Sequence, residues 1–191
     1  MKKTNTKKLT TLGVLAACSI VLVSFIHFPI FPAVSFLEYD PADIPILIGT
    51  FLFGPIWGVV LTVIVSAIQG MTVSAQSGVY GIVMHVVATS AFTLVAGLIY
   101  KPFVGTTKKT LGVILSAVSC PLVNTGIFVA ALFVFYYDLM VQYAAENAFA
   151  GAVAFIFIGI VGLNFVVEFV INVLLIPLVL RLMAILKVTR V

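Results

Sequence analysis

The sequence predicts an all-α integral membrane protein with six transmembrane helices and both termini in the cytoplasm. Three observations carry this prediction. The 191 residues are 63% hydrophobic and only 8% charged, which is more apolar surface than a soluble core of this size can bury. Uncharged runs recur along the chain, each about 20 residues or longer and therefore able to cross a hydrocarbon layer of about 30 Å. The ten basic residues fall into three clusters, as the positive-inside rule requires of cytoplasmic segments.

The charged residues divide this single polytopic domain, residues 1–191, into inside and outside segments. Lysines and arginines occur only within residues 2–8, 101–109 and 181–190. Between these clusters, five of the six acidic residues gather in two segments without a basic residue, and we place those segments outside. The net charge of +4 gives no support for a nucleic-acid partner, because membrane topology already explains where the basic residues lie.

The first helix is expected over residues 9–27, after the basic N-terminal segment. The same pattern also resembles a lipoprotein signal cleaved before Cys18, and residues 32–35 faintly resemble an ordinary signal-peptidase site. A mature lipoprotein would continue into a polar tether, whereas SIVLVSFIHF follows here. We therefore expect an uncleaved helix. Cys18 and Cys120 both lie in apolar runs, which favours buried thiols over a disulfide or a metal site.

Three short helices are expected between the first acidic segment and the second basic cluster. The charge-free stretch from Ile44 to Tyr100 connects outside to inside, so it crosses the membrane an odd number of times. Its 57 residues are too many for one helix and enough for three. Gly54 with Pro55 marks one turn, and Gly78 marks the other. The expected helices span residues 43–53, 55–70 and 79–100.

The last two crossings flank the second acidic segment and are expected over residues 110–136 and 153–181. Polar residues at membrane depth are costly, so their positions are informative. Asn164, Glu168 and Asn172 recur at intervals of four and share one face of the last helix. Further polar stripes contain Thr62, Ser66 and Gln69; His85, Thr89 and Thr93; and Asn124 and Thr125. These stripes predict an internal polar cavity, although interhelical hydrogen bonds also explain the serines and threonines.

Glu168 is the only carboxylate well inside a predicted span. At that depth it needs a ligand, water or a partner, or it stays protonated. No lysine or arginine of this chain is expected there, so we expect Glu168 to bind a polar ligand together with Asn164. A protonated, hydrogen-bonded structural glutamate is the alternative. His85 has no second acid or metal ligand at a fixed spacing from it, and such a lone histidine is more typical of a packing residue than of a proton relay. HExxH, GxSxG and P-loop motifs are missing, which makes an intramembrane enzyme a weak hypothesis.

One stretch resembles a known family. FLEYDPADIPILIGTFLFGPIWGVVLTVIVSAIQG, residues 36–70, is similar to the riboflavin-type S components of energy-coupling factor (ECF) vitamin transporters, in which an acidic, proline-bearing loop leads into a short second helix and a Gly-Pro turn. GVYGIVMHVVATSAFTLVAGLIYK, residues 78–101, continues the similarity. CPLVNTGIF and GLNFVVEFVINVLLIP resemble S components more widely. The resemblance to S components covers nearly the whole chain, and that to the riboflavin type covers about residues 30–101.

The resemblance implies a multi-pass protein of the bacterial cell membrane that binds a vitamin and is not an enzyme. Riboflavin is the first expectation, and pantothenate or cobalamin the alternative. An intramembrane enzyme and a structural or signalling membrane protein are weaker alternatives. The implied partners are a transmembrane coupling subunit and two ATPase subunits. No cofactor is expected, because the vitamin is the substrate and ATP is used by the partner subunits.

The resemblance also implies where ligand and partner bind. In this family the vitamin lies in the outer half of the bundle, under the loop between helices one and two. We expect the acidic residues of that loop to face water, with Asp43 capping the second helix. The expected ligand shell is Phe36, Tyr39, Gln69, His85, Asn124, Asn164 and Glu168. The face expected to pack on the coupling subunit is Gly13, Ala16 and Ala17.

Overall fold

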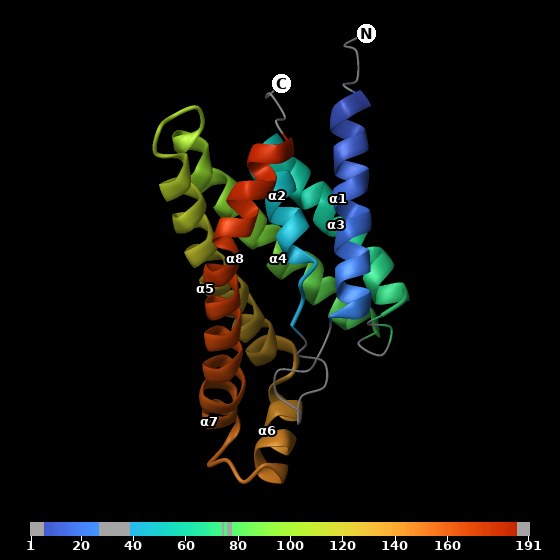
Figure 1. Ribbon diagram of the computed structural model, residues 1–191. Helices are drawn as coiled ribbons and strands as arrows, with labels where there is room; N and C mark the ends of the chain where they lie inside the picture. Colours follow the sequence, from blue (N-terminus) through green and yellow to red (C-terminus); the bar gives the residue numbers. More distant parts are fainter. Residues whose placement is uncertain (1–5, 27–38, 74, 76–77, 187–191) are drawn as a thin grey trace.

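The computed structural model describes residues 6–26, 39–73, 75 and 78–186 (Figure 1). Within these ranges every regular element is helical, and the all-α prediction is confirmed there. The α-helices are α1 (Thr6–Phe25), α2 (Asp43–Phe53), α3 (Pro55–Met71), α4 (Gly78–Tyr100), α5 (Lys109–Phe135), α6 (Tyr137–Glu146), α7 (Ala152–Ala154) and α8 (Leu163–Leu186). A short 3₁₀ helix, η2 (Lys101–Phe103), follows α4, and a π-helical segment, η3 (Phe155–Gly162), joins α7 to α8.

Four helical stretches of the described chain are long and apolar enough to cross a membrane. They are Thr6–Phe25, Ile82–Phe103, Lys109–Phe135 and Ala152–Ile185. The helices α2 and α3 are apolar but shorter, and they lie where the sequence predicted the first two members of the short triple. Helix α6 was not predicted, because its ten residues carry Asp138 and Glu146 and were assigned to an outside loop.

The turn between α2 and α3 forms as its sequence predicts. Gly54 has a φ of +98°, a left-handed conformation that glycine adopts without a steric penalty. Its N–H donates to the carbonyl of Thr50 at 2.8 Å and so ends α2. Pro55 then occupies the first turn of α3, where a residue without an N–H is tolerated. Two short antiparallel helices therefore follow one another within a single apolar run.

Two apolar cores hold the bundle together. The larger one lies among α1–α5 and α8 and includes Ile46, Leu61, Val65 and Phe92. The smaller one lies among the second half of α5, α6, α7 and η3 and contains Leu132, Met140, Ala144, Ala152, Phe155, Ile156 and Ile160. Figure 1 shows that α1 begins and α8 ends at one end of the molecule, whereas α6 and α7 lie at the other end.

Helices α3 and α4 approach each other closely at Gly97. A Cβ atom added at Gly97 would lie 2.7 Å from Cβ and 3.0 Å from Cα of Pro55, so the backbones would have to separate. We expect Gly97→Ala to destabilise the protein by about 1–3 kcal/mol. Thermal unfolding in detergent measures this. The matched control is Gly126→Ala in α5, where a Cβ would meet nothing within 4 Å and the gain in helix propensity is favourable. An equal loss in both variants would contradict the close approach.

Candidate polar ligand site

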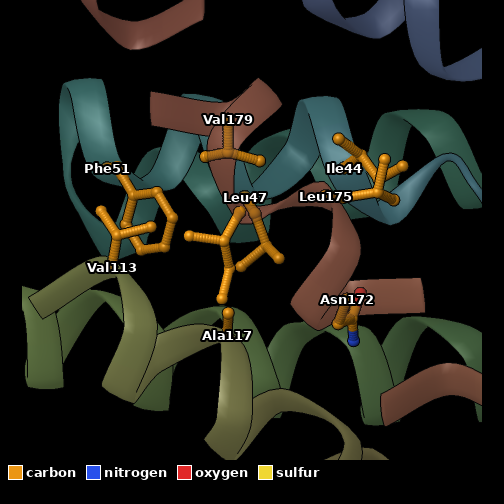
Figure 2. Close-up of a pocket in the computed structure, with 9 residues that line it drawn as sticks. Ile44, Leu47, Phe51, Val113, Ala117, Asn172, Leu175 and Val179 are labelled. Atoms are coloured by element: carbon orange, nitrogen blue, oxygen red, sulfur yellow. The ribbon is translucent and has the colours of Figure 1, made fainter. Parts of the chain in front are cut away.

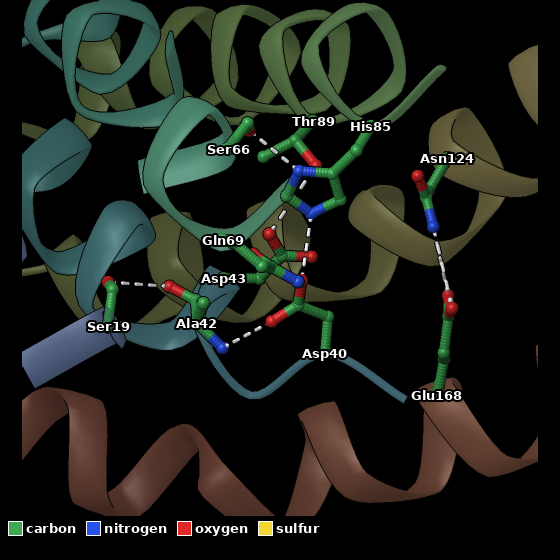
Figure 3. Close-up of polar contacts among 10 residues, drawn as sticks. All are labelled: Ser19, Asp40, Ala42, Asp43, Ser66, Gln69, His85, Thr89, Asn124 and Glu168. Atoms are coloured by element: carbon green, nitrogen blue, oxygen red, sulfur yellow. Dashed lines mark hydrogen bonds and ion pairs between the residues drawn. The ribbon is translucent and has the colours of Figure 1, made fainter. Parts of the chain in front are cut away.

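A single carboxylate connects three elements at the centre of the site (Figure 3). Asp40 lies in the segment just before α2. Its Oδ1 accepts a hydrogen bond from the N–H of Ala42 at 2.8 Å, and its Oδ2 accepts one from Nε2 of Gln69, on α3, at 2.6 Å. Nε2 of His85, on α4, lies 2.9 Å from the same Oδ2. The fold thus brings Asp40 into contact with Gln69, 29 positions further along the chain, and with His85, 45 positions further along.

Both ring nitrogens of His85 have a polar neighbour. Nδ1 lies 2.7 Å from Oγ of Ser66, on α3, while Nε2 faces Asp40. These two contacts fix the orientation of the imidazole ring between α3 and the segment before α2. His85 is therefore more than a packing residue, because both of its ring nitrogens have polar contacts. Its acidic partner, Asp40, lies in the loop before α2 and could not be recognised from a fixed spacing along α4.

Asp40 does not face water, as was expected of the acidic residues of the loop. The side chain of Asp40 is 14% exposed, and it points into the bundle toward His85 (Figure 3). Burial by itself would raise the pKa of Asp40, but the contact with His85 and the hydrogen bonds from Gln69 and Ala42 together lower it below the usual aspartate value. The carboxylate is thus held ionised by its partners. Glu38 lies outside the described residues.

Asp43 does not cap α2. Ala42 occupies the N-cap position, and no side chain makes a capping hydrogen bond there. Asp43 is instead the first residue of the helix. Its Oδ1 accepts a hydrogen bond from Oγ1 of Thr89, on α4, at 3.5 Å. The capping prediction was wrong because the carboxylate reaches across to α4 rather than back to its own backbone.

A second polar contact joins α5 and α8. Nδ2 of Asn124 lies 3.4 Å from both Oε1 and Oε2 of Glu168. Two residues expected in the ligand shell are therefore neighbours, at a distance that makes their hydrogen bonds weak ones. Phe36 and the side chain of Asn164 lie outside the described residues, so their predicted roles stay predictions.

Tyr39 lies close enough to Asp40, Asp43 and Glu168 for their charges to act on its phenol group. Its side chain is buried, with 8% exposed. Burial raises the pKa of Tyr39 most, and the charges of Asp43, Asp40 and Glu168 raise it further, so the phenol stays protonated at neutral pH. Three expected ligand-shell residues from separate parts of the chain, Tyr39, Gln69 and Glu168, thus share one acidic environment.

The site offers hydrogen-bonding capacity that its own residues leave unused. Among the described residues, the Oε1 atom of Gln69, whose amide nitrogen contacts Asp40, is one of the buried side-chain atoms without a hydrogen-bond partner. A buried acceptor without a donor costs about 1–3 kcal/mol, which a ligand donor or a water molecule would recover. Within the same ranges, no group of three or more His, Cys, Asp or Glu residues is arranged to hold a metal ion. The unused acceptor of Gln69 suits a polar ligand that carries a hydrogen-bond donor.

An apolar pocket lies away from these polar groups, between α2, α5 and α8 (Figure 2). Its cavity measures about 20 Å³, which is room for about one water molecule and far too little for a vitamin. Asn172 lines it together with Leu47, Val113 and Val179. The predicted polar stripe on α8 is therefore divided, since Glu168 meets Asn124 whereas Asn172 lines this pocket.

Residues 7–180 match the family model described as the substrate-specific component of ECF transporters. This chain belongs to that family. The family is one of transporter components and not of enzymes. The long apolar helices of this chain agree with a membrane protein. The family match confirms the resemblance to ECF S components that the sequence showed.

Individual relatives agree with the family match. The substrate-specific component is 28% identical over 153 residues to the riboflavin transporter RibU of Lactococcus lactis subsp. cremoris (strain NZ9000), which covers 77% of this chain and 72% of that protein. It is 30% identical over 112 residues to the riboflavin transporter RibU of Staphylococcus aureus (strain TCH60), and the match covers 59% of this chain and 58% of that protein. The solved structure of the S component of a bacterial ECF transporter is similar with a TM-score of 0.67 and 27% identity, over 95% of this chain and 98% of that one.

Proposed function

We propose that this substrate-specific component binds riboflavin and delivers it across the bacterial cell membrane. The observation that carries the proposal is the similarity to riboflavin transporters of two organisms, over 153 and 112 residues. Riboflavin is the cargo in this proposal, and the chain uses no cofactor of its own. Pantothenate or cobalamin would be the cargo if the riboflavin assignment fails.

The polar groups of the site support a flavin ligand. Riboflavin combines a flat ring, whose edge carries carbonyl oxygens and one N–H, with a chain of hydroxyl groups. Glu168 and the Oε1 atom of Gln69 are acceptors for such donors, and the amide of Asn124 supplies both functions. Tyr39 adds an aromatic surface against which a flat ring can pack. A few polar groups placed at the edges of an apolar bundle are typical of a small-molecule site.

We propose six crossings with both termini in the cytoplasm. The four long helices and the two short apolar helices α2 and α3 provide six apolar segments. The beginning of α1 and the end of α8 lie at one end of the molecule (Figure 1), where the basic residues of the sequence also place the cytoplasm. Helix α6, with exposed Asp138 and Glu146, would then lie at the outer face.

The proposed partners are a transmembrane coupling subunit and two ATPase subunits, because the sequence carries no P-loop and the family is that of ECF transporters. On α1, Gly13 and Ala17 are exposed, whereas Ala16 packs partly against the larger core. A Cβ at Gly13 would meet nothing within 4 Å. The outward face through Gly13 and Ala17 thus allows a second helix to approach closely.

The absorption spectrum of the purified, detergent-solubilised protein tests the cargo. We expect a visible flavin band near one-to-one occupancy, and release of a molecule with the mass of riboflavin. Titration of ligand-free protein should quench riboflavin fluorescence. A colourless protein that fails to quench riboflavin would overturn the riboflavin assignment, and the same titration with pantothenate and cobalamin would then identify the alternative.

Replacing Ala17 with leucine tests the partner face. A larger side chain on the exposed side of α1 should separate two closely packed helices, so we expect the coupling subunit to be lost on co-purification while riboflavin affinity is unchanged. The matched control is Ala130→Leu, the same change at an exposed position of α5. Retention of the coupling subunit by the Ala17 variant would exclude this face as the interface.

A further inference from the structure

The segment Tyr39–Ala42 is attached to three helices by side-chain contacts. Oγ of Ser19, a buried residue of α1, donates a hydrogen bond to the carbonyl of Ala42 at 2.9 Å. Asp40 contacts Gln69 on α3 and His85 on α4. Ala42 itself is fully buried. Figure 3 shows these contacts meeting around one short stretch of chain, so the segment is held by polar groups rather than by apolar packing alone.

Of these contacts, Asp40 with His85 is the one between ionisable groups. Asp43, at the start of α2, is the other carboxylate acting on His85, and it contacts Thr89 on the same helix as the histidine. Helix α3 contributes only the neutral groups of Ser66 and Gln69. From α8, Glu168 acts on Asp43 and Tyr39. Removing one member of a buried charge pair leaves the other uncompensated, which is costly.

We propose that the Asp40–His85 pair fastens the segment Tyr39–Ala42 to α3 and α4, and that it thereby sets how fast the bound vitamin is released. Asp40 is then a positioning residue, because it acts through Tyr39 rather than by touching the ligand itself. The part of this inference that concerns the vitamin rests on the proposed function. The part that concerns the segment does not.

The effect should appear in release more than in capture. Tyr39 is buried next to the acidic groups of the site, so loosening the segment displaces one wall of the proposed ligand shell. Contacts that hold a complex together act mainly on the dissociation rate, whereas association rates vary less among variants. We therefore expect a faster dissociation of riboflavin with a nearly constant association rate.

Cysteine labelling tests the fastening without any vitamin. In a Cys18→Ser background, Ala42→Cys introduces a thiol at a fully buried position, and the native Cys120 is also buried. We expect Asp40→Asn and His85→Gln to increase the rate of maleimide labelling at position 42 by at least about tenfold. The reference is Thr107→Cys, at an exposed position, whose labelling should not change. Unchanged labelling at position 42 would overturn the proposal.

A double-mutant cycle on riboflavin dissociation, followed by stopped-flow fluorescence, tests the second part. Asp40→Asn, His85→Gln and the double variant should all release riboflavin faster by at least about tenfold, to a similar extent, because they remove the same pair. Asp138→Asn, an exposed carboxylate on α6, should have no effect. Additive effects of the two single variants, or an unchanged dissociation rate, would overturn the control of release.

The pH profile separates a charge pair from a merely structural contact. Raising the pH until His85 loses its proton removes the imidazolium charge, so riboflavin release should accelerate in the wild type but not in Asp40→Asn. If Asp40→Asn does not fold, His85→Gln, which lacks the same charge pair, takes its place. A wild type that binds no riboflavin would refute the proposed function, and the labelling experiment would still decide whether the pair fastens the segment.

Discussion

Glu168→Ala is expected to weaken riboflavin binding by about 10- to 100-fold. The carboxylate lies between α5 and α8, 3.4 Å from Nδ2 of Asn124, where it can accept a hydrogen bond from an N–H or O–H group of the ligand. A hydrogen bond to a charged group contributes about 1.5–3 kcal/mol, which corresponds to this range of affinity. The dissociation constant from quenching of riboflavin fluorescence measures the effect.

Two further variants show what Glu168 contributes. Glu146→Ala removes an exposed carboxylate from α6 and should leave riboflavin affinity unchanged. Glu168→Gln keeps the size and one acceptor but removes the charge, so an intermediate affinity would indicate a charge-assisted hydrogen bond. If Glu168→Ala binds riboflavin as tightly as the wild type, Glu168 is a structural group that serves Asn124, and it no longer belongs in the ligand shell.

The helices could be predicted because the signals for them are local. Apolar runs, basic clusters and the Gly54–Pro55 turn each act within a few residues of where they stand in the sequence. Helix α6 was missed for the same reason, since Asp138 and Glu146 at its two ends are typical of an exposed outside segment. Its apolar side, with Met140 and Ala144 buried, becomes visible only when α5 and η3 pack against it.

The centre of the site could not be predicted because it depends on long-range contacts. Asp40 stands beside prolines in an acidic stretch, and such a stretch favours an exposed loop. Its partner His85 lies 45 residues further on, and no pattern within either segment specifies the pair. Gln69 and His85 were nevertheless expected in the ligand shell, because polar side chains in apolar helices need partners. The sequence therefore indicated two members of this polar cluster, Gln69 and His85, without indicating that Asp40 connects them.

The smaller core depends on a few aromatic contacts. Phe155 is fully buried, and its ring lies 5.2 Å from that of Phe149 in an edge-to-face arrangement and 6.2 Å from that of Tyr143. These rings belong to η3, to the chain before α7, and to α6. Phe155 thus joins the segments that form the end of the bundle opposite the beginning of α1.

Phe155→Ala is expected to destabilise the protein by about 3–5 kcal/mol, because it removes a large buried ring and leaves a cavity. The control is Phe157→Ala, two residues away and 50% exposed, which should cost about 1 kcal/mol or less. Unfolding in detergent, followed by heat or denaturant, compares the two. Since Phe155 belongs to the smaller core and not to the larger one, hydrogen exchange should increase first in α6 and η3. Equal losses in both variants, or first exchange in α2 and α3, would mean that the smaller core does not form a separately packed unit.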